Sequence, residues 1–306
     1  MSLVSVVISV HNGQEFISKA LDSVLQQSYN NYEILISDDG SNDKTLKIIK
    51  KYKKKFPNKV KIFNNRKTIG LTKSLIKLIN YSKGEFIARL DADDMWDKNL
   101  LKIHINWLSK RKKNVLIGSS GFKINTKNEI IGKFNLKNLG HTELKKKLLF
   151  KNYLLHSSTM FRKKNYYEVG GYNTVFKFSQ DYDLWYRLSN VGKIQNLSEN
   201  LVYIRNSNSS ITSRYKTKQS LYAFIISCIH KENLNININK NLIIVITKLR
   251  KIVNKIHFNS MCYLYSEYLP KKFSKKFSDL DFFTIFYLLK DKKFFFRTII
   301  KKFLLK

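Results

Sequence analysis

Residues 3–90 alternate short apolar runs with stretches of helical periodicity. The apolar runs are rich in β-branched residues, as buried strands are, and amphipathic helical patterns separate them. The expected strands cover residues 3–10, 32–37, 60–63 and 84–90. Strands that alternate with helices form a largely parallel sheet with helices on both faces. The sequence therefore predicts an α/β fold.

Polar side chains lie where three of these expected strands end. They are Ser9 and His11 at the first strand, Asp38 and Asp39 at the second, and Asp91 and Asp93 at the fourth. Ligands of parallel α/β sheets bind beyond the carboxyl ends of the strands. Three separate elements therefore place polar groups on one edge of the sheet, where we expect a binding site.

The sequence Asp91-Ala92-Asp93-Asp94 ends the fourth expected strand. Three carboxylates in four residues repel one another and are unfavourable in a strand. A divalent cation with a phosphate ligand would remove this repulsion, because hard cations bind carboxylate oxygens and magnesium-type sites take one or two of them. The alternative is a solvated acidic turn in front of a helix that begins near Asp97.

Two common phosphate-binding motifs do not occur at this edge. The first expected strand is not followed by Gly-x-Gly-x-x-Gly, and no Gly-Lys-Ser/Thr loop is present. Both a dinucleotide-binding fold and a P-loop are therefore disfavoured. A carboxylate-bound metal is the remaining candidate for holding phosphates.

The charge of the chain restricts its partners. The 306 residues carry a formal net charge of +35, which favours nucleic acid, anionic lipid or phosphorylated substrates. Cys228 and Cys262 are too few for a disulfide framework, so a reducing compartment is expected. The run from Val4 to Val10 lacks the features of a signal peptide, and no apolar run reaches the roughly 18 residues of a membrane span. We therefore expect a cytoplasmic protein.

Three segments together resemble the family 2 glycosyltransferases with the GT-A fold, of the bacterial cell-surface polysaccharide type. They are residues 5–12, the turn Asp38-Asp39-Gly40-Ser41, and residues 88–94, and the similarity runs from about residue 3 to about residue 213. The resemblance implies a Rossmann-like mixed sheet. It also implies an inverting transferase that uses a nucleoside-diphosphate sugar, with UDP as the expected nucleotide, and Mn²⁺ or Mg²⁺.

The family pattern also implies roles for particular residues. Asp39 would bind the nucleobase, with Ser9 and His11 lining the same pocket. Asp91 would approach the ribose, and Asp93 would bind the metal. The implied acceptor is a hydroxyl of a glycan or a lipid-linked molecule.

The second half of the expected site lies further along the chain. Residues 152–162 resemble the acceptor-side strand of the family, where His156 would contact the acceptor or the diphosphate; the alternative is a structural histidine. The family usually has Glu-Asp where this chain has Gln180-Asp181, and that aspartate is the catalytic base. The alternative for Asp181 is a charge that favours the start of a helix.

The loop after residue 203 is the last segment of the resemblance. Many family members carry a histidine at the position of Ser207, and serine lacks the imidazole that can help to hold the metal or the diphosphate. Arg205 would contact the leaving diphosphate, because arginine suits bidentate phosphate binding. The alternative is a surface arginine.

The composition changes after residue 213, which predicts a glycosyltransferase domain over residues 1–213 and a basic helical region over residues 214–306. Residues 281–306 mix phenylalanines with lysine clusters. Such a tail favours peripheral attachment to an anionic membrane surface, on the inner face of the cell membrane. The alternative is a helical subdomain that packs on the catalytic domain.

Two other functions compete with glycosyl transfer. A nucleotidyltransferase also uses a nucleotide and a carboxylate-bound metal, but it releases pyrophosphate, and the turn at Asp39 with Asp181 downstream fits it less well. A basic nucleic-acid-binding protein is compatible with the charge. No recognised binding motif supports it, and the acidic cluster would repel phosphate in the absence of metal. We therefore expect no nucleic-acid partner.

Overall fold

The computed structural model describes residues 2–206 and, further on, residues 215, 219, 220, 222, 223, 226, 227 and 230. The chain divides into two compact units, Met1–Ile236 and Asn237–Lys306. All described residues lie in the first unit. Ser227 Oγ donates a hydrogen bond to the carbonyl of Leu149 at 2.5 Å, and the ring of Tyr222 meets that of Phe176 edge to face. The expected domain boundary at residues 213/214 stays a prediction, and the predicted tail of residues 281–306 lies outside the described residues.

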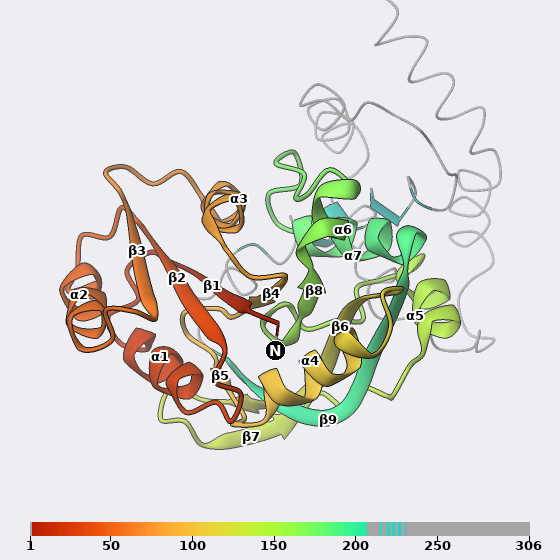
Figure 1. Ribbon diagram of the computed structural model, residues 1–306, viewed down its shortest axis with the longest axis horizontal. Coiled ribbons are helices and arrows are strands. Elements are labelled where there is room, and N and C mark those ends of the chain that lie inside the picture. Colours follow the sequence, from red (N-terminus) through yellow and green to blue (C-terminus); the bar gives the residue numbers. More distant parts are fainter. Residues whose placement is uncertain are drawn as a thin grey trace, which may run out of the picture. The chain divides into compact units, whose positions relative to one another are not determined.

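One mixed sheet forms the centre of the described structure (Figure 1). Its strands follow the order β3-β2-β1-β4-β8-β6-β9-β5, and β7 pairs with β6. The strands are β1 (Val4–Val10), β2 (Tyr32–Asp39), β3 (Val60–Asn65), β4 (Phe86–Arg89), β5 (Met95–Trp96), β6 (Asn114–Ile124), β7 (Ile130–Lys133), β8 (Met160–Arg162) and β9 (Lys193–Arg205).

The direction of the strands sets which ends share an edge. Strands β1 to β4 are mutually parallel. Strand β8 is antiparallel to both β4 and β6, and β9 runs parallel to β6. Strand β6 therefore runs in the same direction as β4, and its carboxyl end lies on the same edge of the sheet as the carboxyl ends of β1, β2 and β4.

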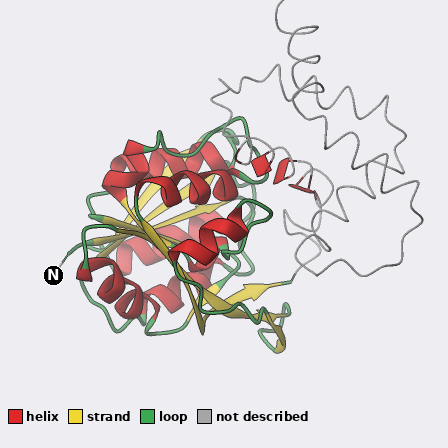
Figure 2. Ribbon diagram, turned by 90° about the vertical axis from the view of Figure 1, so that its right-hand side faces the viewer, coloured by secondary structure: helices red, strands yellow, loops and turns green. Residues whose placement is uncertain are grey.

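Helices cover both faces of this sheet (Figure 2). They are α1 (Ile17–Leu25), α2 (Thr45–Lys55), α3 (Leu71–Tyr81), α4 (Leu100–Lys110), α5 (His141–Leu148), the 3₁₀ helix η1 (His156–Ser158), α6 (Lys163–Glu168) and α7 (Gln180–Val191). Among the described residues, no helix is long and apolar enough to cross a membrane.

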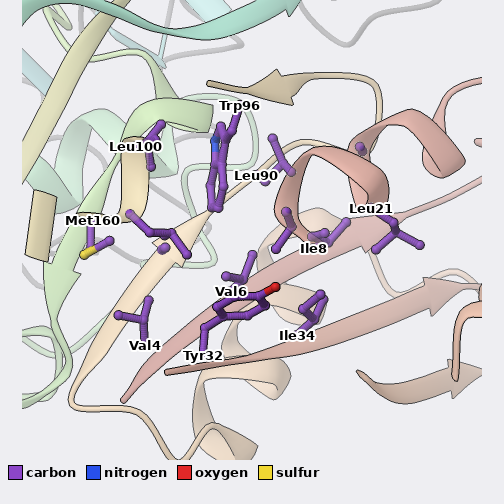
Figure 3. Packing of buried hydrophobic residues seen from close by; sticks show 14 of the residues in the cluster. Val4, Val6, Ile8, Leu21, Tyr32, Ile34, Leu90, Trp96, Leu100 and Met160 are labelled. Carbon is purple, nitrogen blue, oxygen red and sulfur yellow. The ribbon is translucent and has the colours of Figure 1, made fainter. Parts of the chain in front are cut away.

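The core is built around the central strand β1. All seven of its residues are buried, because β2 and β4 flank it and helices cover its two faces. Val6 and Ile8 are fully buried and join Leu21 of α1 and Trp96 of β5 in one apolar cluster (Figure 3). Burying an aliphatic side chain of this kind contributes about 1.5–3 kcal/mol. This packing holds the carboxyl end of β1 rigidly at the polar edge.

The structure confirms the α/β class and the mixed sheet. The four strands expected before residue 91 are present as β1, β2, β3 and β4 within a few residues of their expected bounds. The expected strand over residues 152–162 is wrong in extent: only Met160–Arg162 is a strand, and His156–Ser158 forms a 3₁₀ helix. The tighter turn places the side chains of residues 156 and 157 beside the end of β4.

Candidate active site

The acidic sequence after β4 forms a loop that is tied down by one serine, and we call residues 91–94 the acidic loop. Ser157 Oγ lies 2.8 Å from Asp91 Oδ2 and also contacts Asp94 Oδ2. The backbone N–H of Asp91 donates to Ser157 Oγ at 3.1 Å. Ser157 is only 1% exposed, so the 3₁₀ helix η1 holds the acidic loop from the buried side.

A fully buried arginine lies under the same loop. Arg89, the last residue of β4, pairs with Asp91 Oδ1 through Nη2 at 2.5 Å and contacts the carbonyl of Leu90 through Nη1. Burial by itself would raise the pKa of Asp91, but the positive charge of Arg89 together with the hydrogen bonds from Ser157 and Arg89 lowers the pKa below its usual value. Asp91 therefore stays ionised.

The other two carboxyl groups of the acidic loop behave in the opposite way. Burial and the negative charge of Asp91 raise the pKa of Asp93 to about 6. Burial together with the charges of Asp93 and Asp91 raises the pKa of Asp94 well above its usual value. Asp94 also accepts a hydrogen bond from the backbone N–H of Arg205 at 2.8 Å. The repulsion among the carboxylates of Asp91, Asp93 and Asp94 is therefore only partly offset by the surrounding side chains and backbone groups.

The donor set of the acidic loop fits a hard divalent cation that also binds the substrate. Asp91 is engaged by Arg89 and Ser157, whereas the carboxylate of Asp93 has a hydrogen bond to its own backbone N–H. Among the described residues, no group of three or more His, Cys, Asp or Glu side chains is arranged to hold a metal. The chain supplies one or two carboxylates, as magnesium-type sites require when phosphate and water complete the shell.

The turn after β2 carries the second part of the site. The carboxylate of Asp39 accepts hydrogen bonds from the backbone N–H groups of Ile69 at 2.9 Å and Gly70 at 2.8 Å, and from Asn65 Nδ2 at 3.0 Å. Gly40 follows with φ of 72°, and a Cβ at this position would lie 2.8 Å from the backbone nitrogen of Thr68. Asp39 therefore orders the loop of residues 66–70, a contact that the sequence did not predict.

The end of β1 lies beside this turn. His11 Nδ1 lies 2.9 Å from the backbone carbonyl of Asp39 and must carry the proton of that hydrogen bond. Ser9 is 9% exposed and is the last residue but one of the same strand. The side chain of Asp38 points into the protein instead, and its Oδ1 is buried without a hydrogen-bond partner among the described residues. The expected grouping of Ser9, His11 and Asp39 on one edge is thus present.

Asp181 lies in the first turn of α7. Asn152 Nδ2 donates a hydrogen bond to Asp181 Oδ2 at 2.8 Å, which fixes the carboxylate. Burial raises the pKa of Asp181 to about 6, against the lowering effect of its hydrogen bonds, and the negative charge of Asp91 adds to the rise. Trp185 of the same helix packs against His156, and the neighbouring Ser157 contacts Asp91, so the helix that carries Asp181 lies beside the acidic loop.

His156 is held between aromatic side chains at the base of this site. Its Nε2 lies 3.1 Å from Tyr172 Oη, and its ring packs edge to face against Trp185. Burial, reinforced by the charge of Arg89, lowers the pKa of His156 to about 3 although Asp91 acts in the other direction. The imidazole is therefore neutral at physiological pH.

Arg205 ends β9 next to the acidic loop. Its guanidinium donates to the backbone carbonyl of Asp93 at 2.8 Å, to that of Asn125 at 2.5 Å and to Asn128 Oδ1 at 2.7 Å. The same group stacks over the ring of Phe16. Arg205 is only 3% exposed, so it is not a surface arginine. These three contacts use three of the five N–H donors of the guanidinium, which leaves two for a further acceptor.

Comparison with known proteins decides the family. Residues 5–170 match the model of Glycosyl transferase family 2. The chain belongs to this family. It is therefore a glycosyltransferase, and the resemblance of its three amino-terminal motifs is confirmed.

Two relatives of this family 2 glycosyltransferase come from Escherichia coli. The O-antigen biosynthesis glycosyltransferase WbnJ is 30% identical over 215 residues, which are 69% of this chain and 82% of the relative. The UDP-Glc:alpha-D-GlcNAc-diphosphoundecaprenol beta-1,3-glucosyltransferase WfgD is 33% identical over 132 residues, which are 43% of this chain and 50% of the relative. The relatives thus include enzymes of bacterial polysaccharide biosynthesis.

Solved structures share the GT-A fold with this chain. Staphylococcus aureus TarS in complex with UDP-GlcNAc has a TM-score of 0.61 at 17% identity and covers 92% of this chain and 77% of that chain. The mannosyltransferase PcManGT from Pyrobaculum calidifontis, in complex with GDP-Man and Mn²⁺, has a TM-score of 0.59 at 12% identity. The match covers 89% of this chain and 76% of that chain.

Three residues of this glycosyltransferase site were not singled out from the sequence. Arg89, Asn152 and Ser157 contact the expected aspartates, and all three lie inside the segments that carry the family resemblance. Their chemistry gave no separate signal, because an arginine in an apolar strand and a serine beside a histidine are common. Their roles follow only from the partners that the fold brings to them.

Proposed function

We propose that this family 2 glycosyltransferase inverts the anomeric centre and uses a nucleoside-diphosphate sugar, with UDP as the nucleotide. The acceptor is a hydroxyl of a glycan or of a lipid-linked molecule. One observation supports the proposal: Trp185 of α7, the helix that carries Asp181, packs against His156, and the neighbouring Ser157 contacts Asp91 of the acidic loop. In this proposal Asp181 is the base and the acidic loop the phosphate-binding group, and both act on one sugar.

The chemical step follows from these two groups. Asp181 takes the proton of the acceptor hydroxyl as its oxygen forms a bond to the anomeric carbon, while the bond to the diphosphate oxygen breaks on the opposite side. The raised pKa of Asp181, about 6, leaves the carboxylate ionised at neutral pH and a better proton acceptor than an ordinary aspartate. Asn152 holds its orientation. Direct attack of this kind inverts the anomeric configuration.

The donor lies on the other side of the site in this proposal. Asp39 with Ser9 and His11 borders the nucleobase pocket, and Asp91 approaches the ribose. Asp93 would hold Mn²⁺ or Mg²⁺, which neutralises the charge that develops on the leaving diphosphate.

Two further residues lie close to this donor site. His156, kept neutral by burial, offers a hydrogen bond to the acceptor or the diphosphate. Arg205 brings a guanidinium next to the backbone of Asp93 and is the second candidate contact for the diphosphate.

The proposed location is the cytoplasmic face of the cell membrane, with the protein attached peripherally. The name of the relative WfgD specifies a diphosphoundecaprenol acceptor, and the basic composition of this chain suits an anionic surface. The tail of residues 281–306, which motivated this prediction, lies outside the described residues.

A panel of nucleotide sugars with Mn²⁺, Mg²⁺ or a chelator tests the proposal. We expect transfer from one UDP sugar, release of UDP, loss of activity with the chelator, and a product whose anomeric proton shows the inverted configuration by NMR. Release of pyrophosphate would establish the competing nucleotidyltransferase reaction. Retention of configuration would contradict the assignment of Asp181 as a base for direct attack.

A further inference from the structure

The strands β6 and β7 form a hairpin that stands out from the rest of the fold, and we call residues 122–136 the β6–β7 hairpin. Phe122 of β6 pairs with Lys133 of β7. The turn is closed by the backbone N–H of Asn125, which donates to the carbonyl of Glu129 at 3.0 Å, and Asn125 Nδ2 donates to Glu129 Oε2 at 2.7 Å. The hairpin is therefore an ordered projection. Figure 1 shows β7 along the lower margin of the domain, and β6 separates it from β9 in the sheet.

Two large apolar side chains at the start of β7 are exposed. Ile130 is 55% exposed and Ile131 is 52% exposed. Ile124 pairs with Ile130 and Lys123 with Gly132, so the register shifts at Ile131, which is an extra residue of the ladder and departs from the regular alternation of faces. In the described part of the chain, β7 pairs with β6 alone, and its other edge is open. Exposed apolar residues on an edge strand are unfavourable in water unless something covers them.

The charge around these isoleucines is strongly positive. Residues 123–137 contain four lysines, at positions 123, 127, 133 and 137, and Glu129 as their single acidic residue. None of the four lysines forms an ion pair with a described residue, and Glu129 is engaged by Asn125. A surface that is negatively charged as well as apolar would therefore be complementary to this part of the hairpin.

The base of the hairpin is stiffened by aromatic contacts. The ring of Phe122 stacks on Tyr203 of β9 with centroids 5.4 Å apart. Lys133 Nζ lies 5.5 Å from the ring of Phe122, and Lys123 Nζ lies 5.1 Å from that of Phe134. These contacts fix the orientation of the hairpin relative to the rest of the sheet.

The hairpin also lies next to the acidic loop. Strand β6 ends on the same edge of the sheet as β4, where the acidic loop begins. Arg205 joins the two directly, because its guanidinium binds both the turn of the hairpin, at Asn125 and Asn128, and the carbonyl of Asp93. A surface that covers the tip of the hairpin therefore borders the candidate active site.

We propose that the β6–β7 hairpin docks the enzyme on an anionic lipid bilayer. Ile130 and Ile131 enter the headgroup boundary, and Lys123, Lys127 and Lys133 contact the lipid phosphates. A bilayer supplies both the apolar layer and the negative charge that this surface requires. A nucleic acid offers the charge without the apolar layer, and a four-residue strand is too short to form a stable interface between two copies by itself.

Docking in this way would also orient the active site for the proposed reaction. This orientation rests on the lipid-linked acceptor proposed above. The bilayer would hold the edge with the acidic loop towards the membrane surface, where such an acceptor diffuses. Lipid-linked and soluble acceptors would then differ in their dependence on the hairpin. Binding to lipid, in contrast, is independent of whether the enzyme is active.

Sedimentation of the full chain with lipid vesicles tests the docking. The vesicles contain phosphatidylcholine alone or phosphatidylcholine mixed with phosphatidylglycerol. We expect binding to the anionic vesicles, weakened about tenfold by the double change Ile130→Ser and Ile131→Ser, which removes most of the exposed apolar surface. Lys127→Gln should weaken it about fivefold, the effect of one lysine near an anionic surface. The matched control is Val191→Ser, a partly exposed aliphatic residue at the end of α7.

A local probe separates the hairpin from the basic tail, which carries its own predicted affinity for lipid. In a chain with Cys228→Ser and Cys262→Ser, the change Ile131→Cys allows a polarity-sensitive dye to be placed at the tip. The dye emission should shift to the blue with anionic vesicles, and the same dye placed through Val191→Cys should not shift. No shift at position 131 while the chain sediments with vesicles would overturn the proposal, as would a full chain that ignores anionic vesicles at low salt.

Two readouts keep this test separate from the proposed reaction. The Ile130→Ser, Ile131→Ser chain should keep its melting temperature and its turnover with a soluble acceptor, and should lose turnover with the acceptor embedded in vesicles. A blue shift at position 131 that grows with protein concentration without lipid would instead show that a second copy covers the hairpin, and docking on lipid would be wrong. Absence of any transferase activity with intact vesicle binding would reject the proposed reaction and leave the docking in place.

Discussion

Ser157 Oγ lies 2.8 Å from Asp91 Oδ2, across 66 positions of the sequence. The same hydroxyl contacts Asp94 Oδ2. A serine hydroxyl has one proton to donate, so it cannot donate to two carboxylates at once. Burial and the charges of Asp93 and Asp91 raise the pKa of Asp94 well above its usual value, which favours the protonated carboxyl group, and in that form Asp94 can donate the second hydrogen bond. The acidic loop is therefore held in place by a shared proton network.

Ser157→Ala should loosen the acidic loop. We expect a loss of about 1–3 kcal/mol in the free energy of unfolding, because buried carboxyl oxygens lose their partner, together with weaker metal-dependent binding of UDP. Chemical denaturation and calorimetry measure the two effects. Ser158→Ala is the matched control: Ser158 Oγ donates to the carbonyl of Leu155 and accepts from the backbone N–H of Ser119, so its loss should lower stability without changing the dependence on metal.

Asp93→Ala should abolish the metal-dependent part of donor binding. The carboxylate of Asp93 is the one in the acidic loop that Arg89 and Ser157 do not engage. Titration of UDP in the presence of Mn²⁺ and of a chelator measures the difference. Glu168→Gln, a change on the surface helix α6 where Glu168 accepts a hydrogen bond from Asn165, should leave it unchanged. A metal-dependent affinity that survives in Asp93→Ala would show that another group binds the cation.

Asp181→Asn should lower turnover by about a hundredfold or more, the usual contribution of a positioned base. The amide keeps the size of the side chain and can still accept the hydrogen bond from Asn152, so donor and metal binding should persist. In the unchanged enzyme, kcat should fall as the pH drops below about 6, where Asp181 takes up a proton. Turnover of Asp181→Asn within a few-fold of the original would mean that Asp181 is a helix-start charge.

The same substitution should make the folded protein more stable at neutral pH. Burial raises the pKa of Asp181 from 3.8 to about 6, so the folded state binds the proton more tightly than the unfolded state. The ionised carboxylate therefore destabilises the fold above pH 6, and this effect disappears as the pH falls towards 4. Asp181→Asn should gain on the order of 1–3 kcal/mol at neutral pH. Urea unfolding at both pH values measures it, and an equal gain at low pH would point to a different cause.

Asp39→Ala should weaken donor binding far more than it slows turnover at saturation. Its carboxylate binds the backbone N–H groups of Ile69 and Gly70, so its loss frees the loop in front of α3 that borders the expected nucleobase pocket. Hydrogen exchange of those two amides should accelerate, and KM should rise while kcat changes little. A kcat that falls with KM unchanged would place Asp39 in the chemistry instead.

Local patterns in the sequence were sufficient for the first half of the fold. The β-branched runs at residues 3–10 and 32–37 became the central strands, because an apolar run of that length is buried on both faces whatever follows it. The acidic loop was visible because three like charges in four residues are rare. The edge on which Ser9, Asp39 and Asp91 meet followed from the topology of parallel strands.

The second half of the site was less accessible to such reasoning. The 3₁₀ helix at His156–Ser158 replaced an expected strand, because Ser158 and Thr159 bond the carbonyls of Leu155 and His156. Arg205 looked like a phosphate contact or a surface residue, and the structure buries it between the hairpin turn and Asp93. The local sequence around these residues predicts neither the 3₁₀ helix nor the burial of Arg205.

The sequence by itself determined the family and the α/β class and pointed to the candidate aspartates of the site, since these depend on short-range patterns of charge and apolar residues. The tertiary structure alone decided which of those aspartates stay charged. Arg89 keeps Asp91 ionised, whereas burial raises the pKa values of Asp93 and Asp181 to about 6. The physical reason is that the energy of a carboxylate depends on its distance to other charges and on its exclusion from water, and both are set by contacts between residues far apart in the chain.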